Sequence, residues 1–365
     1  DAAQHEKMNA NAEDFRKITM KVLVMQLAST TIMDMVAYGG AGLGIAFAVS
    51  GVVNRGLSPI AALFLVLVAV DFFLPLRAFG SAFHVAMNGA SAGKKILSLL
   101  EQPDPVWGSE VPTGTDLALQ NVTFSYDGQR DVLKNVNMAF PKKGMTAIVG
   151  ESGCGKSTVV NMLYGAFRPQ KGIVLVGSKP LETLSRESYY SKLSVVSYNT
   201  YIFNETIRSN FQIANPKVTD EQIYEALTQV NLLDFVRENG GLDKVIIEDA
   251  NNISGGQKQR LALAVSLVAD KPIYIFDEAT SNIDVESEAI ITRNMKSLSK
   301  EKSVIVISHR LANVVPADCI YYMEAGEVKE RGSHAELMEK NGGYAQLYLT
   351  QKQLEEGYTE VGSNE

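Results

Sequence analysis

The stretch GESGCGKST (residues 150–158) has the composition and spacing of a loop that binds phosphate groups. Its first residue is Gly150, and Gly155-Lys156-Ser157 follows at the distance that such loops require. In this arrangement backbone N–H groups surround the phosphates of ATP, the Lys neutralises their charge and the Ser hydroxyl binds Mg²⁺. The sequence therefore predicts contacts with ATP and Mg²⁺ from Gly150, Glu151, Ser152, Gly153, Cys154, Gly155, Lys156, Ser157 and Thr158.

The residues around this loop predict the order strand, loop, helix. Three strand-like runs, LALQNVTFSY, VLKNVNMAF and MTAIVG, precede the loop, and the last leads directly into Gly150. The run STVVNMLYGAF that follows is expected to form a helix. Because phosphate-binding loops occur in this context, we expect an α/β nucleotide-binding fold.

Two later strand-like runs end in side chains suited to hydrolysis. IYIFDE (residues 273–278) ends in Asp277, which would reach Mg²⁺, and Glu278, which would orient or deprotonate the attacking water. The plainer alternative is a strand end with two exposed acids, which the preceding phosphate loop disfavours. SVIVIS (residues 303–308) leads to His309, for which we expect contact with the γ-phosphate and the water. Lys156, Glu278 and His309 are thus the predicted catalytic residues.

The first hundred residues contain two long apolar runs. Residues 35–53 carry no charge, and residues 57–76 carry one, Asp71. Each run is long enough to cross a bilayer, so we expect membrane helices at about residues 18–53 and 58–100. A buried soluble hairpin is the alternative. For Asp71, a place on a substrate pathway and a purely structural place both stay open.

Charge predicts how this hairpin is oriented. Basic residues precede the first run and follow the second, whereas the turn between them carries only Arg55. The positive-inside rule therefore places both outer ends in the cytosol. The basic residues outside the turn are Lys7, Arg16, Lys17, Lys21, Arg77, Lys94 and Lys95.

Composition limits the remaining function classes. The net charge of −7 over 365 residues gives no reason to expect a nucleic-acid partner. Two cysteines, Cys154 and Cys319, imply no disulfide framework and suit a reducing compartment. Residues 101–115 are rich in Pro and Gly and are expected to form a linker. The charged start without Met resembles no signal peptide and suggests a piece of a longer protein.

The run ISGGQKQR (residues 253–260) resembles the signature of ATP-binding-cassette (ABC) ATPases. The family's other motifs follow in order: an aromatic at Tyr126, the phosphate loop, ISGGQ, IYIFDE, SNID (residues 281–284) and SHR (residues 308–310). This resemblance implies an ABC nucleotide-binding domain over residues 116–350. A partial membrane domain (residues 1–100) would precede it, and a polar tail (residues 351–365) would follow.

The resemblance also assigns roles to residues outside the phosphate loop. It implies that Tyr126 stacks on adenine and that Asp284 belongs to a loop linking two ATP sites. The signature would contact ATP held by a partner cassette, and a Gly-rich turn that opens a helix offers free N–H groups to an anion. The signature residues are Ser254, Gly255, Gly256 and Gln257.

Residues 72–96 (FFLPLRAFGSAFHVAMNGASAGKKI) resemble exporters whose membrane and ATPase domains are fused in one chain. They more closely resemble the cysteine/glutathione exporter subunits associated with cytochrome bd assembly. The resemblance implies one ATP-hydrolysing half of an exporter, multi-pass in the cell membrane among lipid, with a cytoplasmic ATPase domain. A second half-transporter, identical or different, would be its partner, and about four further membrane helices would lie upstream. The exported small molecule would be a thiol, a peptide or a drug-like solute.

One position departs from the family pattern. Five residues before Phe203 the family has a Gln that contacts Mg²⁺ and water, and this chain has Tyr198. A Tyr side chain offers no amide oxygen, although Asn199 would if the loop shifted by one residue. The plainer alternative is that this loop tolerates the change. The exporter also has two rival interpretations: a non-transport ABC ATPase, which the apolar runs oppose, and a regulatory ABC ATPase with weak hydrolysis, which only Tyr198 favours.

Overall fold

The computed structural model describes residues 2–101, 107–247, 252–281 and 283–362. The chain divides into two compact units, Asp1–Asp104 and Pro105–Glu365. The boundary falls within the residues expected to form a linker, of which 102–106 lie outside the described residues. Each unit is described below by itself.

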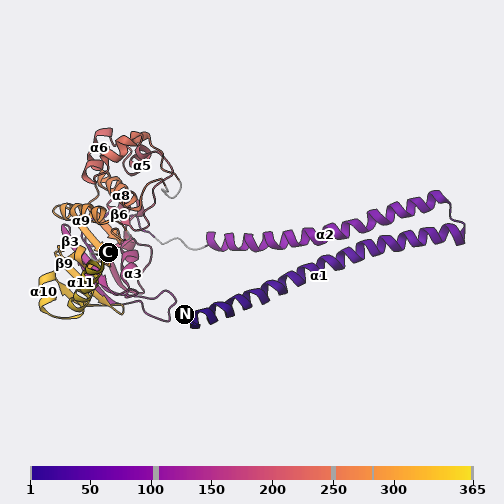
Figure 1. Cartoon of the computed structure of the whole chain (residues 1–365), viewed down its shortest axis with the longest axis horizontal. Coiled ribbons are helices and arrows are strands. Elements are labelled where there is room, and N and C mark those ends of the chain that lie inside the picture. Colours follow the sequence, from indigo (N-terminus) through magenta and orange to yellow (C-terminus); the bar gives the residue numbers. More distant parts are fainter. Residues whose placement is uncertain (1, 102–106, 248–251, 282, 363–365) are drawn as a thin grey trace. The chain divides into compact units, whose positions relative to one another are not determined.

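The first unit is a pair of long helices, α1 (Ala2–Arg55) and α2 (Pro59–Leu100), drawn in indigo and violet in Figure 1. The turn uses Gly56 at φ +68°, and the Ser58 hydroxyl caps α2 by accepting the Ala61 N–H. The helices approach closely at Gly44, where an added Cβ would lie 2.6 Å from the Ala69 Cβ. Small residues at such a crossing are typical of membrane helix pairs.

Helix α1 starts well before the expected position near residue 18. Residues 2–17 contain neither Pro nor Gly, so the helix continues through this charged segment. Within the described residues, Ala12–Arg55 is long and apolar enough to cross a membrane, while the apolar start of α2, Pro59–Ala69, is shorter. Several side chains between residues 70 and 84, including Arg77, lie outside the described residues, so the second span is not shown.

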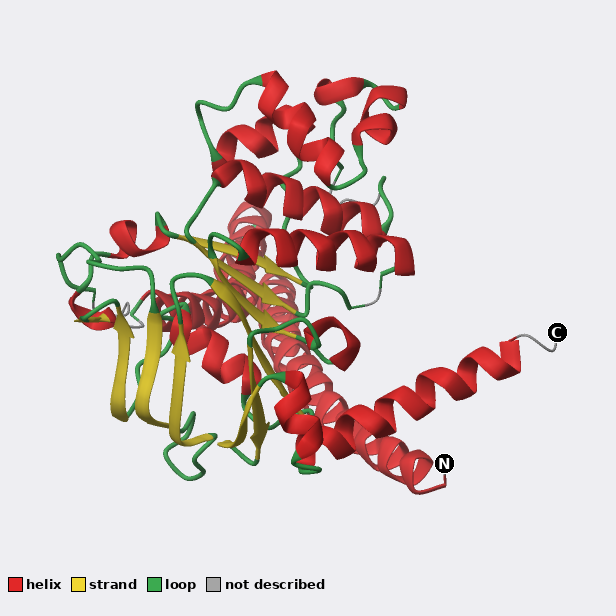
Figure 2. Cartoon of the chain, turned by 90° about the vertical axis from the view of Figure 1, so that its left-hand side faces the viewer, coloured by secondary structure: helices red, strands yellow, loops and turns green. Residues whose placement is uncertain are grey.

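Two sheets form the framework of the second unit (Figure 2). The six-stranded sheet has the order β10-β9-β3-β8-β7-β6, and its strands are parallel except β10. Its strands are β3 (Gly144–Gly150), β6 (Leu193–Ser197), β7 (Ile273–Asp277), β8 (Ser303–Ile307), β9 (Cys319–Glu324) and β10 (Glu327–Gly332). The antiparallel sheet has the order β2-β1-β4-β5. Its strands are β1 (Leu117–Phe124), β2 (Leu133–Phe140), β4 (Lys171–Val176) and β5 (Lys179–Pro180).

Strand alternation divides the interior of this unit into two apolar clusters. Val304 and Val306 of β8 belong to one cluster, and Ile305 and Ile307 belong to the other. Because β8 is buried on both faces, nearly all of its residues are apolar, which explains the continuous apolar run in the sequence. The first cluster packs against helices, and the second packs against the antiparallel sheet and the helix that follows the phosphate loop.

The helices of this unit surround the sheets, and α5, α6 and α8 gather at one end of it (Figure 1). They are α3 (Lys156–Leu163), α4 (Arg186–Tyr190), α5 (Ile207–Ala214), α6 (Asp220–Gln229), α7 (Leu233–Glu238), α8 (Gly255–Ala269), α9 (Val285–Ser299), α10 (His334–Glu339) and α11 (Gly343–Gly362). Short 3₁₀ turns include η4 (Leu311–Val314). Helix α11 includes residues that the sequence suggested as a polar tail, because their Gln, Lys and Glu are also good helix formers.

Candidate nucleotide site

The predicted phosphate loop joins the end of β3 to the start of α3. Gly150, Gly153 and Gly155 have φ values of +149°, +80° and +109°, which L side chains rarely adopt. A Cβ added at Gly150 would lie 2.2 Å from the Met323 carbonyl oxygen, and one at Gly155 would lie 2.9 Å from the Leu133 Cδ2. Both positions therefore require glycine for conformation and for space.

Lys156 places its charge inside the loop. Its Nζ donates to the carbonyl oxygens of Gly150 at 2.8 Å and Glu151 at 2.9 Å, and the Cys154 Sγ is 3.8 Å away. The side chain is only 5% exposed. No carboxylate is among these hydrogen-bond partners, so the ammonium group is placed to contact a phosphate.

A pocket of about 250 Å³ opens beside the loop and unites three of the sequence motifs. The phosphate loop supplies most of its wall, and the residues after β7 and β8 supply the acid and the imidazole. The described residues that line it are Val132, Ser152, Gly153, Gly155, Lys156, Ser157, Thr158, Glu278 and His309.

Tyr126 stands at the edge of this region on the segment after β1. Its hydroxyl lies 3.0 Å from the Thr158 Oγ1, and its ring makes edge contacts with Phe124 and Phe167. The side chain is nevertheless 58% exposed. The aromatic contacts fix the ring while leaving surface for a flat base to stack on.

The two carboxylates after β7 have different environments. Burial, and then the neighbouring Glu278, raise the pKa of Asp277, while His309 and Lys156 lower it. Glu278 has a left-handed backbone, φ +53°, and its N–H donates to the Ile307 carbonyl of β8 at 2.9 Å. This turn directs the Glu278 carboxylate to His309, with 2.8 Å between Oε1 and Nε2.

The signature residues begin helix α8. The Ser254 hydroxyl accepts the Gln257 N–H at 3.2 Å, and the Gln257 side chain accepts the Ser254 N–H at 2.9 Å. These reciprocal bonds form a capping box. A Cβ added at Gly256 would lie 2.2 Å from the Asp284 Oδ2, so only glycine fits there.

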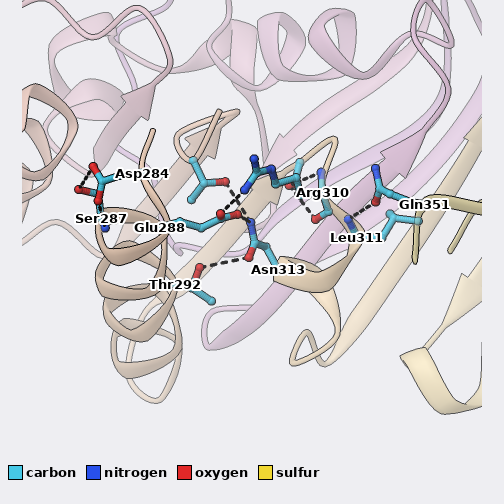
Figure 3. Close-up of polar contacts among 10 residues, drawn as sticks. Asp284, Ser287, Glu288, Thr292, Arg310, Leu311, Asn313 and Gln351 are labelled. Carbon is cyan, nitrogen blue, oxygen red and sulfur yellow. Dashed lines mark hydrogen bonds and ion pairs between the residues drawn. The ribbon is translucent and has the colours of Figure 1, made fainter. Parts of the chain in front are cut away.

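Asp284 is itself a helix cap. Its carboxylate accepts the N–H and the hydroxyl of Ser287, each at 2.8 Å (Figure 3). The signature and Asp284 therefore form one surface, and the described residues that line the pocket include none of its members. Asn282, which precedes this cap, lies outside the described residues.

The loop at Tyr198 is fixed by a residue that the sequence did not single out. The Tyr198 N–H donates to the Asp277 carbonyl at 2.9 Å. Gln259 of α8, buried at 4% exposure, donates from Nε2 to the carbonyls of Ser197 and Tyr198 at 3.2 and 2.6 Å. Gln259 was visible only as part of ISGGQKQR, and the described lining of the pocket includes neither Tyr198 nor Asn199.

Comparisons with known proteins agree with this geometry. Residues 133–281 match the family model described as ABC transporter. The chain is 45% identical over 360 residues to an uncharacterized ABC transporter ATP-binding protein of Haemophilus influenzae, covering 98% of this chain and 64% of that protein. It is 34% identical over 351 residues to an ATP-dependent lipid A-core flippase of Chromohalobacter salexigens, covering 94% of this chain and 60% of that protein.

A comparison with solved structures also finds similarity to an ABC transporter. A bacterial Atm1-family ABC exporter with ATP bound matches 93% of this chain and 60% of its own, with a TM-score of 0.66 and 26% identity. The chain thus spans less than two thirds of the length of these relatives.

The fold and the site define an ABC-type ATPase domain. The prediction of an α/β domain that follows a long apolar helix in the sequence is confirmed. The chain that carries this domain is homologous to ABC exporters, which does not favour the non-transport and regulatory alternatives. These comparisons do not specifically support the resemblance to cysteine/glutathione exporter subunits.

Proposed function

We propose that the chain is the ATP-binding and ATP-hydrolysing half of an ABC exporter, which couples ATP turnover to export of a small molecule. The observation that carries this proposal is the single pocket that contains Lys156, Glu278 and His309. The apolar segment Ala12–Arg55 in the same chain supports a place in the membrane. The exporters among its relatives support the direction of transport.

The proposed chemistry assigns one task to each side chain. The loop N–H groups and Lys156 would bind the phosphates, and Tyr126 would stack on adenine. Mg²⁺ would neutralise charge that develops on the phosphates, held by Ser157 and Asp277. Burial disfavours the charge of the Asp277 carboxylate, and a bound cation would neutralise that charge.

Glu278 would accept a proton from the attacking water or orient it. The imidazole of His309, 2.8 Å from the Glu278 carboxylate, would contact the γ-phosphate and the same water. Because two groups share one hydrogen bond, each restricts the position of the other.

A second ABC half-transporter would complete the site. Ser254, Gly255, Gly256 and Gln257 form the start of α8 and do not line the pocket, which supports contact with ATP held by a partner chain. Asp284 would link the two sites because it lies against Gly256. The partner would be an identical or a different chain.

The membrane part would be multi-pass in the cell membrane, with the ATPase domain in the cytoplasm. Basic residues at the outer ends of both helices support this orientation. Large apolar side chains such as Phe47 and Ile60, 76% and 82% exposed, would need lipid or other membrane helices around them. Asp71 would face a partner group or the substrate path.

The transported molecule would be a thiol, a peptide or a drug-like solute. The resemblance of residues 72–96 to cysteine/glutathione exporter subunits supports a thiol. Inside-out vesicles that contain the chain and its partner should accumulate labelled glutathione or cysteine when ATP and Mg²⁺ are present. Accumulation only of another solute would remove the thiol assignment. A chain that leaves the membrane on alkaline washing would contradict the exporter itself.

A further inference from the structure

The loop that carries His309 is held by one side chain from the far end of the sequence. Gln351 of α11 donates from Nε2 to the His309 carbonyl at 2.6 Å and accepts the Leu311 N–H at Oε1 at 2.7 Å. Figure 3 shows Gln351 beside Leu311. A carbonyl and an N–H two residues apart need a partner with both a donor and an acceptor, which an amide side chain provides.

Helix α11 presents Gln351 from a fixed position. Tyr344 in its first turn is buried in the same apolar cluster as Leu311, and Leu347 and Tyr348 of the next turn pack against that cluster. The Tyr344 hydroxyl also lies 2.8 Å from the Nδ1 of His334 on α10. Because the helix and the loop share one apolar cluster, the Gln351 amide cannot move far without disturbing it.

The other side of the loop is held by α9. The Arg310 guanidinium pairs with Glu288, and Glu288 accepts the Asn313 amide at 2.5 Å. The same amide group of Asn313 donates to the Thr280 hydroxyl at 3.1 Å. Figure 3 shows Glu288, Arg310 and Asn313 in one connected group. These bonds connect the loop to the segment just after Glu278.

We propose that Gln351 is a positioning residue for ATP hydrolysis. Through this residue, α11 helps to orient the loop that carries His309. It holds the backbone on both sides of Arg310 and so fixes the direction in which the His309 imidazole points. This inference rests on the proposed function, in which His309 contacts the γ-phosphate. Gln351 has no place in the nucleotide pocket, so it acts on the rate of hydrolysis and leaves ATP affinity unchanged.

The test compares Gln351→Met with Gln353→Met in the full chain assembled with its partner. Met keeps the length of Gln and removes the donor and the acceptor. Gln353 is an exposed residue of the same type on the same helix, so it controls for the substitution itself. Gln351→Met should lower kcat about tenfold with an unchanged KM for ATP, because two hydrogen bonds to the loop are lost. Gln353→Met should match the unsubstituted chain.

Hydrogen exchange provides a readout that does not depend on turnover. The Leu311 amide should exchange faster in Gln351→Met than in Gln353→Met. Gln351→Glu is the second variant: a carboxylate cannot donate to the His309 carbonyl, so kcat should fall at least as far.

The possible failures are distinguishable. Unchanged kcat in Gln351→Met beside an active unsubstituted chain overturns this inference alone. A raised KM, or a loss that follows a lowered unfolding temperature, also overturns it, because Gln351 would then act through binding or stability. An unsubstituted chain without ATP turnover in the presence of its partner overturns the proposed function and this inference together.

Discussion

The phosphate loop depends on glycine for two separate reasons, conformation and space. Gly150 and Gly153 both have positive φ, but only Gly150 lies against a backbone atom, the Met323 carbonyl oxygen. A Cβ at Gly153 would meet nothing within 4 Å. The two positions therefore separate the cost of conformation from the cost of a clash.

Gly150→Ala should destabilise the nucleotide-binding unit by about 2 kcal/mol more than Gly153→Ala, because the added methyl group must displace backbone. It should also weaken ATP binding, since β3 and the loop would shift. Denaturant unfolding and nucleotide titration of both variants measure these effects. Equal losses for the two substitutions would contradict the packing around Gly150.

Asp284 gives a pH dependence with a defined sign. Hydrogen bonds from the backbone and side chain of Ser287 lower the pKa of Asp284. A carboxyl with a depressed folded pKa contributes stability above its unfolded pKa, and that contribution is lost as pH falls through the folded value.

The unfolding midpoint of Asp284→Asn should therefore lie below that of the unsubstituted chain at neutral pH. The difference should persist to about pH 5 and shrink only below about pH 4. It should stay under about 1 kcal/mol because the carboxylate is exposed. Thermal unfolding across this range measures it, and a difference that does not depend on pH would count against the ionised cap.

At the residue scale, the side chains that line the pocket were easier to predict from the sequence than the side chains that hold the surrounding loops. Lys156, Glu278 and His309 were predictable because each follows a strand with a recognisable end, and parallel strands bring such ends together. Gln259 and Gln351 were not predicted as supports, because each acts on backbone groups far away in the sequence. Only the folded chain brings Gln351 to the His309 loop.

At the scale of elements, three of the described helices begin with a capping box, and two of these, α8 and α6, differ in their proposed roles. Ser254 with Gln257 caps α8, and Thr219 with Gln222 caps α6. Each box satisfies backbone N–H groups that the first turn leaves without partners. Only the first box lies in the surface proposed to meet a partner's ATP.

Ser254→Ala and Thr219→Ala should each destabilise the unit by about 1 kcal/mol, the usual cost of a lost cap. ATP turnover should fall only in Ser254→Ala, because its hydroxyl would also contact the γ-phosphate of the partner's nucleotide. Unfolding and steady-state turnover on matched samples separate the two effects. Similar turnover in both variants would mean that Ser254 acts only as a helix cap.

Element boundaries were less predictable than element types. Residues 2–17 and 351–362 are charged and polar, so they were expected to lie outside the membrane helix and the last domain. The structure makes both helical, since helix formers extend a helix that neighbouring residues have nucleated. The polarity of these segments therefore did not indicate the end of a helix.

For the whole molecule, the central feature is the separation of the two surfaces that we propose to contact nucleotide within one chain. The pocket holds Lys156, Glu278 and His309, whereas Ser254 and Asp284 lie on the other surface. In the proposed arrangement one chain would supply half of each of two sites, which is why turnover is expected from a pair. The sequence could suggest this arrangement only through the family resemblance, because spacing along one chain carries no information about a second.

The most direct test is ATP turnover and ATP binding by Glu278→Gln, measured in membranes with the partner present. The amide keeps the shape of the side chain but cannot accept a proton from water, so turnover should fall by about 100-fold or more. ATP should still bind, because Lys156 and the phosphate loop are unchanged. Turnover equal to that of the unsubstituted chain would contradict the assignment of Glu278 and, with it, the proposed hydrolytic site.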